Sequence, residues 1–290
     1  MLVYSIFRII LFFFRILPFR GLHFLADLVY IFLLYIIKYR RRVIEENLLA
    51  CFPNMSEIER YSLVKKTYRN LADILIEGIK GLLLSKEEIF SRNTFIKASI
   101  VNEYLEKGQS VICVCGHYNN WEWTVLGIGY HFQNKAIGIY KKISNSYVEK
   151  YIKQLRAKSS MLLLPTSETR KMVDEIPKGK LILLMADQNP SNVRDAIWVK
   201  FFNKETACLH GLEKYSKTYN LPVIYMGMQR VKRSLYTLEF TLLVENPAAC
   251  KYGEITQRFM SMLEKTIIDD PSNWLWSHKR WKHTRSLNQL

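Results

Sequence analysis

Residues 111–123 have the sequence Val-Ile-Cys-Val-Cys-Gly-His-Tyr-Asn-Asn-Trp-Glu-Trp. The short apolar, partly β-branched run at its start predicts a buried strand, and Gly116 predicts a turn where that strand ends. Asn119 is a good N-cap for the apolar, helix-like run that follows it. The stretch therefore predicts a strand, a turn and a helix, with His117 exposed on the turn.

The same alternation continues through the rest of the chain. Residues 43–107 are predicted to be helical, because their apolar spacing is helical and β signals are few. Beyond them, strand-like and helix-like runs alternate, which predicts an α/β fold, an αβα sandwich with a mostly parallel central sheet. A late hairpin is expected around residues 230–234. The predicted strands are 111–115, 136–140, 162–164, 181–185, 222–228 and 235–244, and the predicted helices are 119–132, 145–157, 168–176, 207–219 and 254–268.

The first 42 residues predict a membrane-associating segment ahead of a main domain over 43–290. Residues 1–17 are apolar except for Tyr4, Ser5 and two arginines seven positions apart, which favours a helix lying in the membrane interface. Residues 22–37 form a second apolar run, shorter than the roughly 20 residues of a membrane span, and a buried core helix is its alternative. Basic residues follow it, as is typical beside anionic headgroups. No small-residue cleavage site follows the first run, so a signal peptide is disfavoured.

The composition indicates an anionic partner, with a soluble basic protein as the alternative. The chain has 42 Lys and Arg against 26 Asp and Glu, a formal net charge of +16. Acidic lipid or an acidic protein fits this charge better than nucleic acid, because no nucleic-acid-binding motif is present. The five cysteines are an odd number without framework spacing, which favours reduced thiols in the cytoplasm. No cofactor motif is present.

His117 and Glu122 predict acid–base chemistry. A neutral imidazole can take a proton from an alcohol near pH 7, and a carboxylate on its other nitrogen stabilises the imidazolium that forms. No Gly-x-Ser-x-Gly motif occurs, which favours direct activation of a substrate hydroxyl. The two side chains can meet only if His117 lies on the turn and Glu122 in the first helical turn. The alternatives are a capping box for Glu122, with Asn119 as N-cap, and an ordinary loop histidine.

Three polar residues follow the ends of predicted strands. His117, Lys141 and Asp187 are expected at one rim of the sheet, where ligands of such folds usually bind. A turn-forming role before Asn189-Pro190 is the alternative for Asp187.

Two further possibilities involve cysteines beside His117. One is a partial zinc site with Cys113 and Cys115, which lacks a fourth ligand, and the other is Cys115 as a covalent nucleophile.

The chain resembles the bacterial lipid A late acyltransferases in an ordered set of segments. They are Asn47-Leu48, Phe52-Pro53, Gly-His-Tyr-Asn-Asn-Trp-Glu at 116–122, Ala-Asp-Gln-Asn-Pro at 186–190, Phe201-Phe202, Leu-Pro-Val-Ile at 221–224, and Trp-Leu-Trp-Ser-His-Lys-Arg-Trp-Lys at 274–282. The resemblance covers about 42–282. It implies an inner-membrane enzyme, on the cytoplasmic face, that moves a fatty acyl chain from acyl carrier protein to a hydroxyl of a lipid A precursor.

The resemblance also implies roles for residues at matching positions. His117 and Glu122 would be the catalytic pair, Arg156 and Asp187 further active-site residues, and Asn120, Lys141 and Gln188 substrate contacts. Two departures are visible, since the family usually has Gly where this chain has Asn203 and often Arg where it has Lys141. From sequence alone, Arg156 lies among lysines, so a solvated helix face is its alternative.

The expected partners are acyl carrier protein, a glycolipid acceptor and an anionic membrane surface, with no nucleic acid, metal or cofactor. The basic stretch 141–158 is the predicted surface for the acidic carrier. The Trp-rich segment 274–282 predicts either an anchor at lipid headgroups or a buried aromatic cluster. Acyl transfer to another lipid, hydrolysis of a thioester or lipid, and non-catalytic lipid binding remain the alternative functions.

Overall fold

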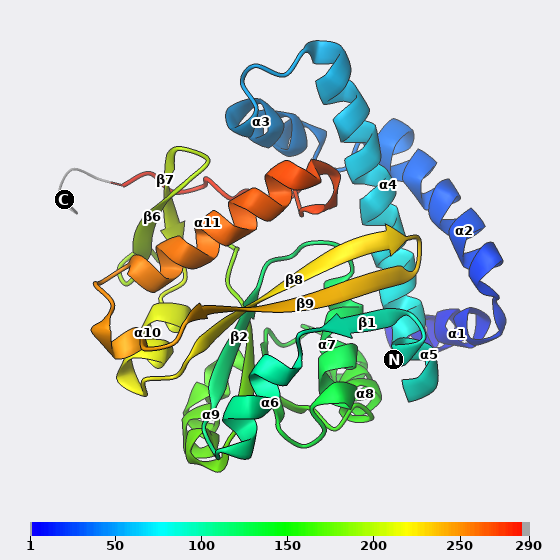
Figure 1. Ribbon diagram of the computed structural model, residues 1–290. Coiled ribbons are helices and arrows are strands. Elements are labelled where there is room, and N and C mark those ends of the chain that lie inside the picture. The colour runs from blue at the N-terminus through cyan, green and yellow to red at the C-terminus, as the bar shows by residue number, and fades with distance from the viewer. Residues whose placement is uncertain (1, 286–290) are drawn as a thin grey trace.

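The computed structural model describes residues 2–285. Its centre is a seven-stranded sheet, seen in Figure 1. Strands β2, β3, β4, β5 and β8 run parallel to one another, whereas β9 is antiparallel to β8 and β1 is parallel to β9. The predicted α/β class with a mostly parallel sheet is confirmed. In sheet order the strands are β1 (Asn93–Ile96), β9 (Leu235–Val244), β8 (Val223–Lys232), β2 (Val111–Cys115), β5 (Leu181–Met185), β3 (Ala136–Tyr140) and β4 (Leu162–Pro165).

Helices cover both faces of this sheet, as the fully buried central strand β2 requires. Ile112 and Val114 face a core formed with α11, whereas Val111, Cys113 and Cys115 face a second core formed with α7. Short 3-10 turns occur at 166–168, 176–178, 247–249 and 271–273. The helices after the N-terminal pair are α3 (Arg41–Cys51), α4 (Glu57–Gly81), α5 (Lys86–Phe90), α6 (Ser99–Glu106), α7 (Trp121–His131), α8 (Ser146–Ala157), α9 (Thr169–Glu175), α10 (Gly211–Thr218) and α11 (Glu254–Asp269).

Three strands were not predicted from the sequence. Strand β1 lies in the region expected to be wholly helical, and β6 (Ile197–Phe201) and β7 (Lys204–Cys208) form a separate hairpin. The helix expected from residue 207 therefore begins only at Gly211. Phe202 and Asn203 make the two-residue turn of the hairpin, with φ of 49° and 57°. Asn tolerates this left-handed conformation, so the tight turn forms without glycine.

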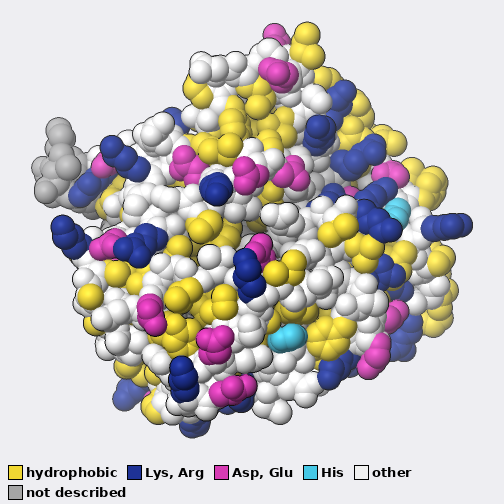
Figure 2. All heavy atoms as spheres, in the orientation of Figure 1, with side chains coloured by type: hydrophobic (Ala, Val, Ile, Leu, Met, Phe, Trp, Pro, Cys, Tyr) yellow, Lys and Arg dark blue, Asp and Glu magenta, His cyan; other side chains and the backbone are white. Residues whose placement is uncertain are grey.

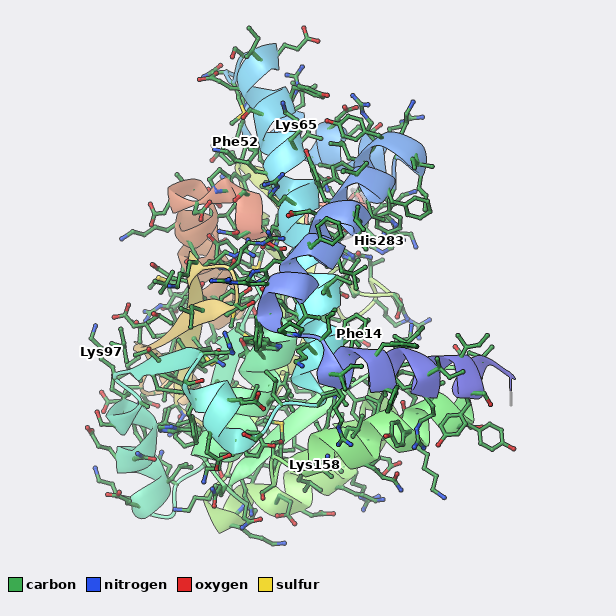
Figure 3. All side chains as sticks on the ribbon, turned by 90° about the vertical axis from the view of Figure 1, so that its right-hand side faces the viewer. Phe14, Phe52, Lys65, Lys97, Lys158 and His283 are labelled. Carbon is green, nitrogen blue, oxygen red and sulfur yellow. The ribbon has the colours of Figure 1, made fainter. Side chains whose placement is uncertain are left out.

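Two apolar helices precede α3. Helix α1 (Leu2–Ile16) and α2 (Phe19–Ile31) meet at a corner with Pro18 as the N-cap, and α2 continues as a π-helical turn over Phe32–Ile36. In Figure 3, α1 lies along α8 while α2 crosses α4. Lys80 of α4 fixes the corner, because its ammonium group donates to three backbone carbonyls at the end of α1. The helical structure is thus interrupted only at the corner, and residues 19–21 already belong to α2.

The N-terminal helices keep much of their apolar surface uncovered. Figure 2 shows hydrophobic and basic side chains interspersed along the edge where α1 and α2 lie in Figure 1. Phe12, Phe24 and Ile36 are 62%, 66% and 67% exposed. Residues Phe19–Ile36 form one helix that is long and apolar enough to cross a membrane, and only 17% of it is buried within the protein. A buried core helix, the alternative for this run, is therefore disfavoured.

Candidate active site

The parallel pair β2 and β5 brings His117 and Asp187 together. Cys115 lies opposite Met185 at the carboxyl ends of these neighbouring strands, and the two polar residues each follow two positions later. The Nδ1 atom of His117 lies 2.6 Å from Oδ1 of Asp187. The backbone N–H of His117 and the indole N–H of Trp274 both donate to Oδ2 of Asp187, each at 2.9 Å. Asp187 thus accepts three hydrogen bonds.

Burial and charge act in opposite directions on this pair. The Asp187 side chain is 2% exposed and that of His117 is 17% exposed. Burial favours the neutral carboxyl, but the charge of His117 and the three hydrogen bonds outweigh it and hold the pKa of Asp187 at about 2. For His117, burial lowers the pKa, but the charge and hydrogen bond of Asp187 and the charge of Glu122 raise it above its ordinary value. The pair is therefore an ion pair whenever the imidazole is protonated.

The second imidazole nitrogen of His117 is placed to act as an acceptor. With Nδ1–H donating to Asp187, Nε2 carries the lone pair of the neutral ring. The amide nitrogen of Gln188 lies 3.3 Å from Nε2, as a donor would. The ring of Trp121 packs edge-on against the imidazole, with the ring centroids 5.2 Å apart. This is the tautomer that a general base acting through Nε2 requires.

Glu122 does not hold the imidazole. Its Oε2 atom lies 2.5 Å from Nη2 of Arg156, which reaches it from α8. The orienting carboxylate predicted at Glu122 is Asp187 instead, because the helix starts later than expected and directs the Glu122 side chain towards α8. The N-cap of α7 is Asn120, not Asn119, so Glu122 is the second helical residue. Arg156 is accordingly part of a partly buried ion pair rather than a solvated face.

The three predicted substrate contacts, Asn120, Lys141 and Gln188, differ in their surroundings. Asn120 is fully buried, and its amide is used within the protein: Oδ1 accepts from the N–H of Trp123, and Nδ2 donates to Oε2 of Glu77. Both polar atoms of the Asn120 side chain are thus occupied within the protein, and its contact with substrate stays a prediction. Lys141 follows β3, which neighbours β5, and is exposed at the same end of the sheet. Gln188 lies beside His117, with its amide nitrogen 3.3 Å from Nε2 of the imidazole.

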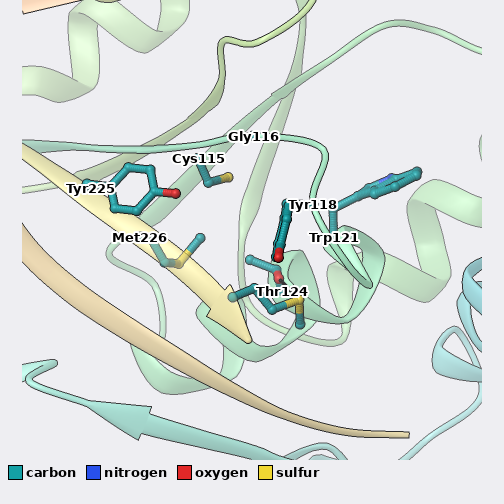
Figure 4. Close-up of a pocket in the computed structure, with 8 residues that line it drawn as sticks. Cys115, Gly116, Tyr118, Trp121, Thr124, Tyr225 and Met226 are labelled. Carbon is teal, nitrogen blue, oxygen red and sulfur yellow. Dashed lines mark hydrogen bonds between the residues drawn. The ribbon is translucent and has the colours of Figure 1, made fainter. Parts of the chain in front are cut away.

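A small cavity lies behind the loop that carries His117, between β2, β8 and α7 (Figure 4). The Cys115 thiol is buried there, and burial raises the pKa of this thiol well above its ordinary value. A protonated, buried thiol is a poor nucleophile, so the structure disfavours Cys115 as the attacking group. The cavity is lined mainly by sulfur-containing and aromatic side chains: Cys115, Gly116, Tyr118, Trp121, Thr124, Tyr225, Met226 and Met228.

The C-terminal segment contributes residues whose role was not predicted. The indole of Trp274 donates to Asp187. The N–H of Asn119 donates to the carbonyl of Asn273, and the N–H of Leu275 donates to the carbonyl of His117. His278 accepts from the N–H of Asn189, and burial lowers its pKa to about 4, which keeps it neutral near pH 7. The Trp-rich segment was singled out in the sequence, but its pairing with the strand ends could not be inferred from one sequence.

Comparison with known proteins gives a family match over nearly the whole chain. The family model for bacterial lipid A biosynthesis acyltransferases matches residues 1–283. The chain belongs to this family. Three relatives are similar at low identity. A lipid A biosynthesis acyltransferase of Haemophilus influenzae is 24% identical over 84% of this chain and 78% of its own. A lipid A biosynthesis lauroyltransferase of Escherichia coli K12 is 23% identical over 84% of this chain and 80% of its own. A lipid A biosynthesis palmitoleoyltransferase of the same organism is 24% identical over 87% of this chain and 82% of its own.

Three segments that lie far apart in the chain meet at this edge of the sheet. The segments 116–122, 186–190 and 274–282, which carry the resemblance, are far apart in the chain and form one site in this acyltransferase. Their contacts run through Asp187, which bonds to His117 from the first segment and to Trp274 from the third. No group of three or more His, Cys, Asp or Glu side chains that could hold a metal ion occurs within residues 2–285.

Proposed function

We propose that this acyltransferase moves a fatty acyl chain from an acyl thioester, carried by acyl carrier protein, to a hydroxyl of a lipid A precursor. The observation that carries the proposal is the His117–Asp187 pair at the sheet edge, with Nε2 of His117 left to accept a proton. Thioester-to-ester transfer needs one base of this kind. The family and its relatives, which act in lipid A biosynthesis, support the proposed acceptor class.

The reaction proceeds in two balanced steps. Nε2 of His117 takes the proton of the acceptor hydroxyl while its oxygen attacks the thioester carbonyl, and Asp187 stabilises the imidazolium. The tetrahedral intermediate then expels the thiolate as the C–S bond breaks, and the proton on His117 returns to the sulfur. A thiol has a pKa of about 8.5, so its departure needs little acid assistance. The products are an ester and a free thiol.

Arg156 is the side-chain candidate for stabilising the developing oxyanion. Its side chain is only 19% exposed, and Glu122 fixes one nitrogen of its guanidinium group. A fixed and partly desolvated cation stabilises negative charge more than a mobile surface lysine does. In this assignment Glu122 acts on the reaction through Arg156 and through its charge near His117.

The carrier and the membrane are assigned to two neighbouring surfaces. Helix α8 carries Lys150 and Lys153 beside Arg156, with Lys158 directly after it, and a net positive surface attracts an acidic carrier protein. Helices α1 and α2 offer exposed apolar side chains among basic ones, which suits the cytoplasmic face of the inner membrane. Because α1 packs on α8, the two surfaces are adjacent.

The test is acyl transfer by purified wild-type and His117→Ala protein from acyl carrier protein thioester to a lipid A precursor, followed by mass spectrometry. We expect wild-type protein to give a product heavier by one acyl group and His117→Ala to give none. Free fatty acid in place of acylated lipid would identify a hydrolase. Undiminished transfer by a folded His117→Ala protein would refute the proposal, since a base is then not needed at this position.

A further inference from the structure

Glu77 is a buried carboxylate that has no role in the reaction proposed above. It lies on α4 and is 1% exposed, so its charge must be matched by hydrogen bonds within the protein. Three side chains donate to its two oxygens. Ser234 donates to Oε1 at 2.8 Å, and Oε2 accepts from Asn120 at 2.8 Å and from Tyr236 at 2.5 Å. All three donors are themselves buried.

One of these donors lies at the start of α7, the helix that follows His117. Asn120 is the N-cap of α7, and its Oδ1 accepts from the N–H of Trp123 while Nδ2 is held by Glu77. The cap is three residues after His117 and two before Glu122. A rotation of the Asn120 amide would therefore disturb the turn that presents the imidazole and the first helical turn that presents Glu122 to Arg156.

The backbone around Glu77 holds the same turn from a second direction. The carbonyl of Glu77 accepts from the indole N–H of Trp123 at 2.7 Å. A Cβ atom added to Gly81 would lie 2.5 Å from that indole nitrogen, and one added to Gly78 would lie 3.4 Å from the Glu122 side chain. The glycines let α4 approach α7 closely enough for the hydrogen bonds of Glu77 to form.

We propose that Glu77 is a positioning residue for acyl transfer, which fixes the His117–Glu122 turn through Asn120. The inference rests on the proposed function, because it takes His117 as the base. A carboxylate is needed at this position, since every contact of its two oxygens is a donor. The side chain introduced by Glu77→Gln would have nearly the same shape, but its amide nitrogen would face donors, and a buried group left without its partner is costly.

The experiment compares Glu77→Gln with wild-type protein in steady-state transfer and in amide hydrogen exchange. We expect kcat to fall by about 10- to 100-fold, the size of effect that a small misplacement of a catalytic group produces. KM for the acyl donor should change little, because no donor contact is removed. Amides of residues 118–124 should exchange faster. A wild-type kcat with wild-type protection of this turn would overturn the proposal.

Glu213→Gln is the matched control. Glu213 is also a buried helical glutamate with three donors, at 3% exposure, but it holds the N–H groups of Gly253 and Thr256 and the hydroxyl of Thr256 at the start of α11. We expect faster exchange at the start of α11 with kcat and the 118–124 amides unchanged. If Glu213→Gln lowers kcat as much as Glu77→Gln does, the effect is general destabilisation and the positioning role is refuted.

A rescue variant separates positioning from loss of stability. The double variant Glu77→Gln with Asn120→Asp reverses donor and acceptor between the two side chains, and the introduced aspartate can still cap α7. Recovery of most of the lost kcat is expected, and no recovery counts against the proposal. If wild-type protein transfers no acyl chain, the proposed function fails, whereas the hydrogen-exchange comparison still decides whether Glu77 fixes the turn.

Discussion

Asp187 is the carboxylate that bonds to the imidazole of His117, and among residues 2–285 no other carboxylate does so. Wild-type kcat/KM should rise with pH through the raised pKa of His117, because only the neutral imidazole accepts a proton. In Asp187→Asn the opposing charge is lost while burial remains. The inflection should therefore move to lower pH, and the plateau should fall by about 10²- to 10⁴-fold, as when the aspartate of a catalytic triad is replaced.

The measurement is the pH–rate profile of both proteins between about pH 5 and 9, a range that includes the ordinary pKa of histidine and the raised value expected for His117. An inflection that stays in place would contradict the assignment of Asp187 as the partner of His117. Titration of the imidazole by NMR gives the same comparison without turnover.

The same pair predicts how stability depends on pH. The pKa of Asp187 is depressed to about 2, so its contribution is present above the unfolded value near 3.8 and is lost as pH falls towards 2. The pKa of His117 is raised, so its contribution is present below about 6.5 and is lost as pH rises through the folded value. The difference in unfolding free energy between wild type and Asp187→Asn should be largest between about pH 4 and 6.5.

Denaturant unfolding across this range checks that expectation. A stability difference that keeps growing above neutral pH would have the wrong sign for a histidine–carboxylate ion pair.

At the residue scale, the sequence predicted His117 and Asp187 at one rim but paired the imidazole with Glu122. Glu122 is close to His117 in the chain, whereas Asp187 is 70 positions away. Only the adjacency of β2 and β5 decides between them, and one sequence does not encode strand order in a readable form.

Among the elements, the contact between α4 and α7 is the most sensitive to added volume. Gly81→Ala would place a methyl group 2.5–2.6 Å from the buried indole of Trp123 and break the bond from that indole to Glu77. We expect a loss of about 1–3 kcal/mol in unfolding free energy, typical of overpacking. Thermal or denaturant unfolding measures it.

Gly211→Ala in α10 is the control for that substitution. The nearest atoms to its added Cβ are 3.8 Å away, on the ring of Tyr215. Alanine is the better helix residue, so this variant should equal or exceed the parent in stability by up to about 1 kcal/mol. Equal destabilisation by the two substitutions would show that close packing at Gly81 is not the cause.

The elements themselves were predicted unevenly. Strands β2, β3, β5 and β9 have the predicted limits. The first three are short, bounded apolar runs, and β9 alternates buried apolar with less buried residues along most of its length. Strands β1 and β7 contain charged or polar residues and lie at an edge or in a separate hairpin, so their pairing comes from tertiary contacts rather than from local pattern.

For the whole molecule, the exposed N-terminal helices and the charge of +16 predict binding to anionic lipid vesicles that weakens with salt. Phe12→Asp and Phe24→Asp should each lower partitioning by about tenfold or more, since burying one phenylalanine is worth about 1.5–3 kcal/mol. Vesicle co-sedimentation measures this.

Tyr252→Asp is the matched control, because Tyr252 is 77% exposed and directly precedes α11, whose first turn lies on the opposite side of Figure 1 from α1 and α2. Its partitioning should match wild type apart from the single added charge. Equal losses in all three variants would show that the N-terminal helices are not the membrane-facing surface. At this scale the α/β class with a mostly parallel sheet was predictable, whereas the contacts of the last segment with the site were not.

The contacts of the last segment with Asp187 and with the turn at Tyr118 have a consequence for when the enzyme becomes active during its synthesis. The indole that completes the hydrogen bonding of Asp187 is residue 274, and the neighbouring residues 273 and 275 bond to the backbone on both sides of Tyr118. At roughly 5–20 residues per second, a ribosome reaches Trp274 about 10–50 s after finishing α2. A nascent chain therefore exposes its apolar leading helices well before it can hold its imidazole in place, so delivery to a lipid surface can precede the first turnover.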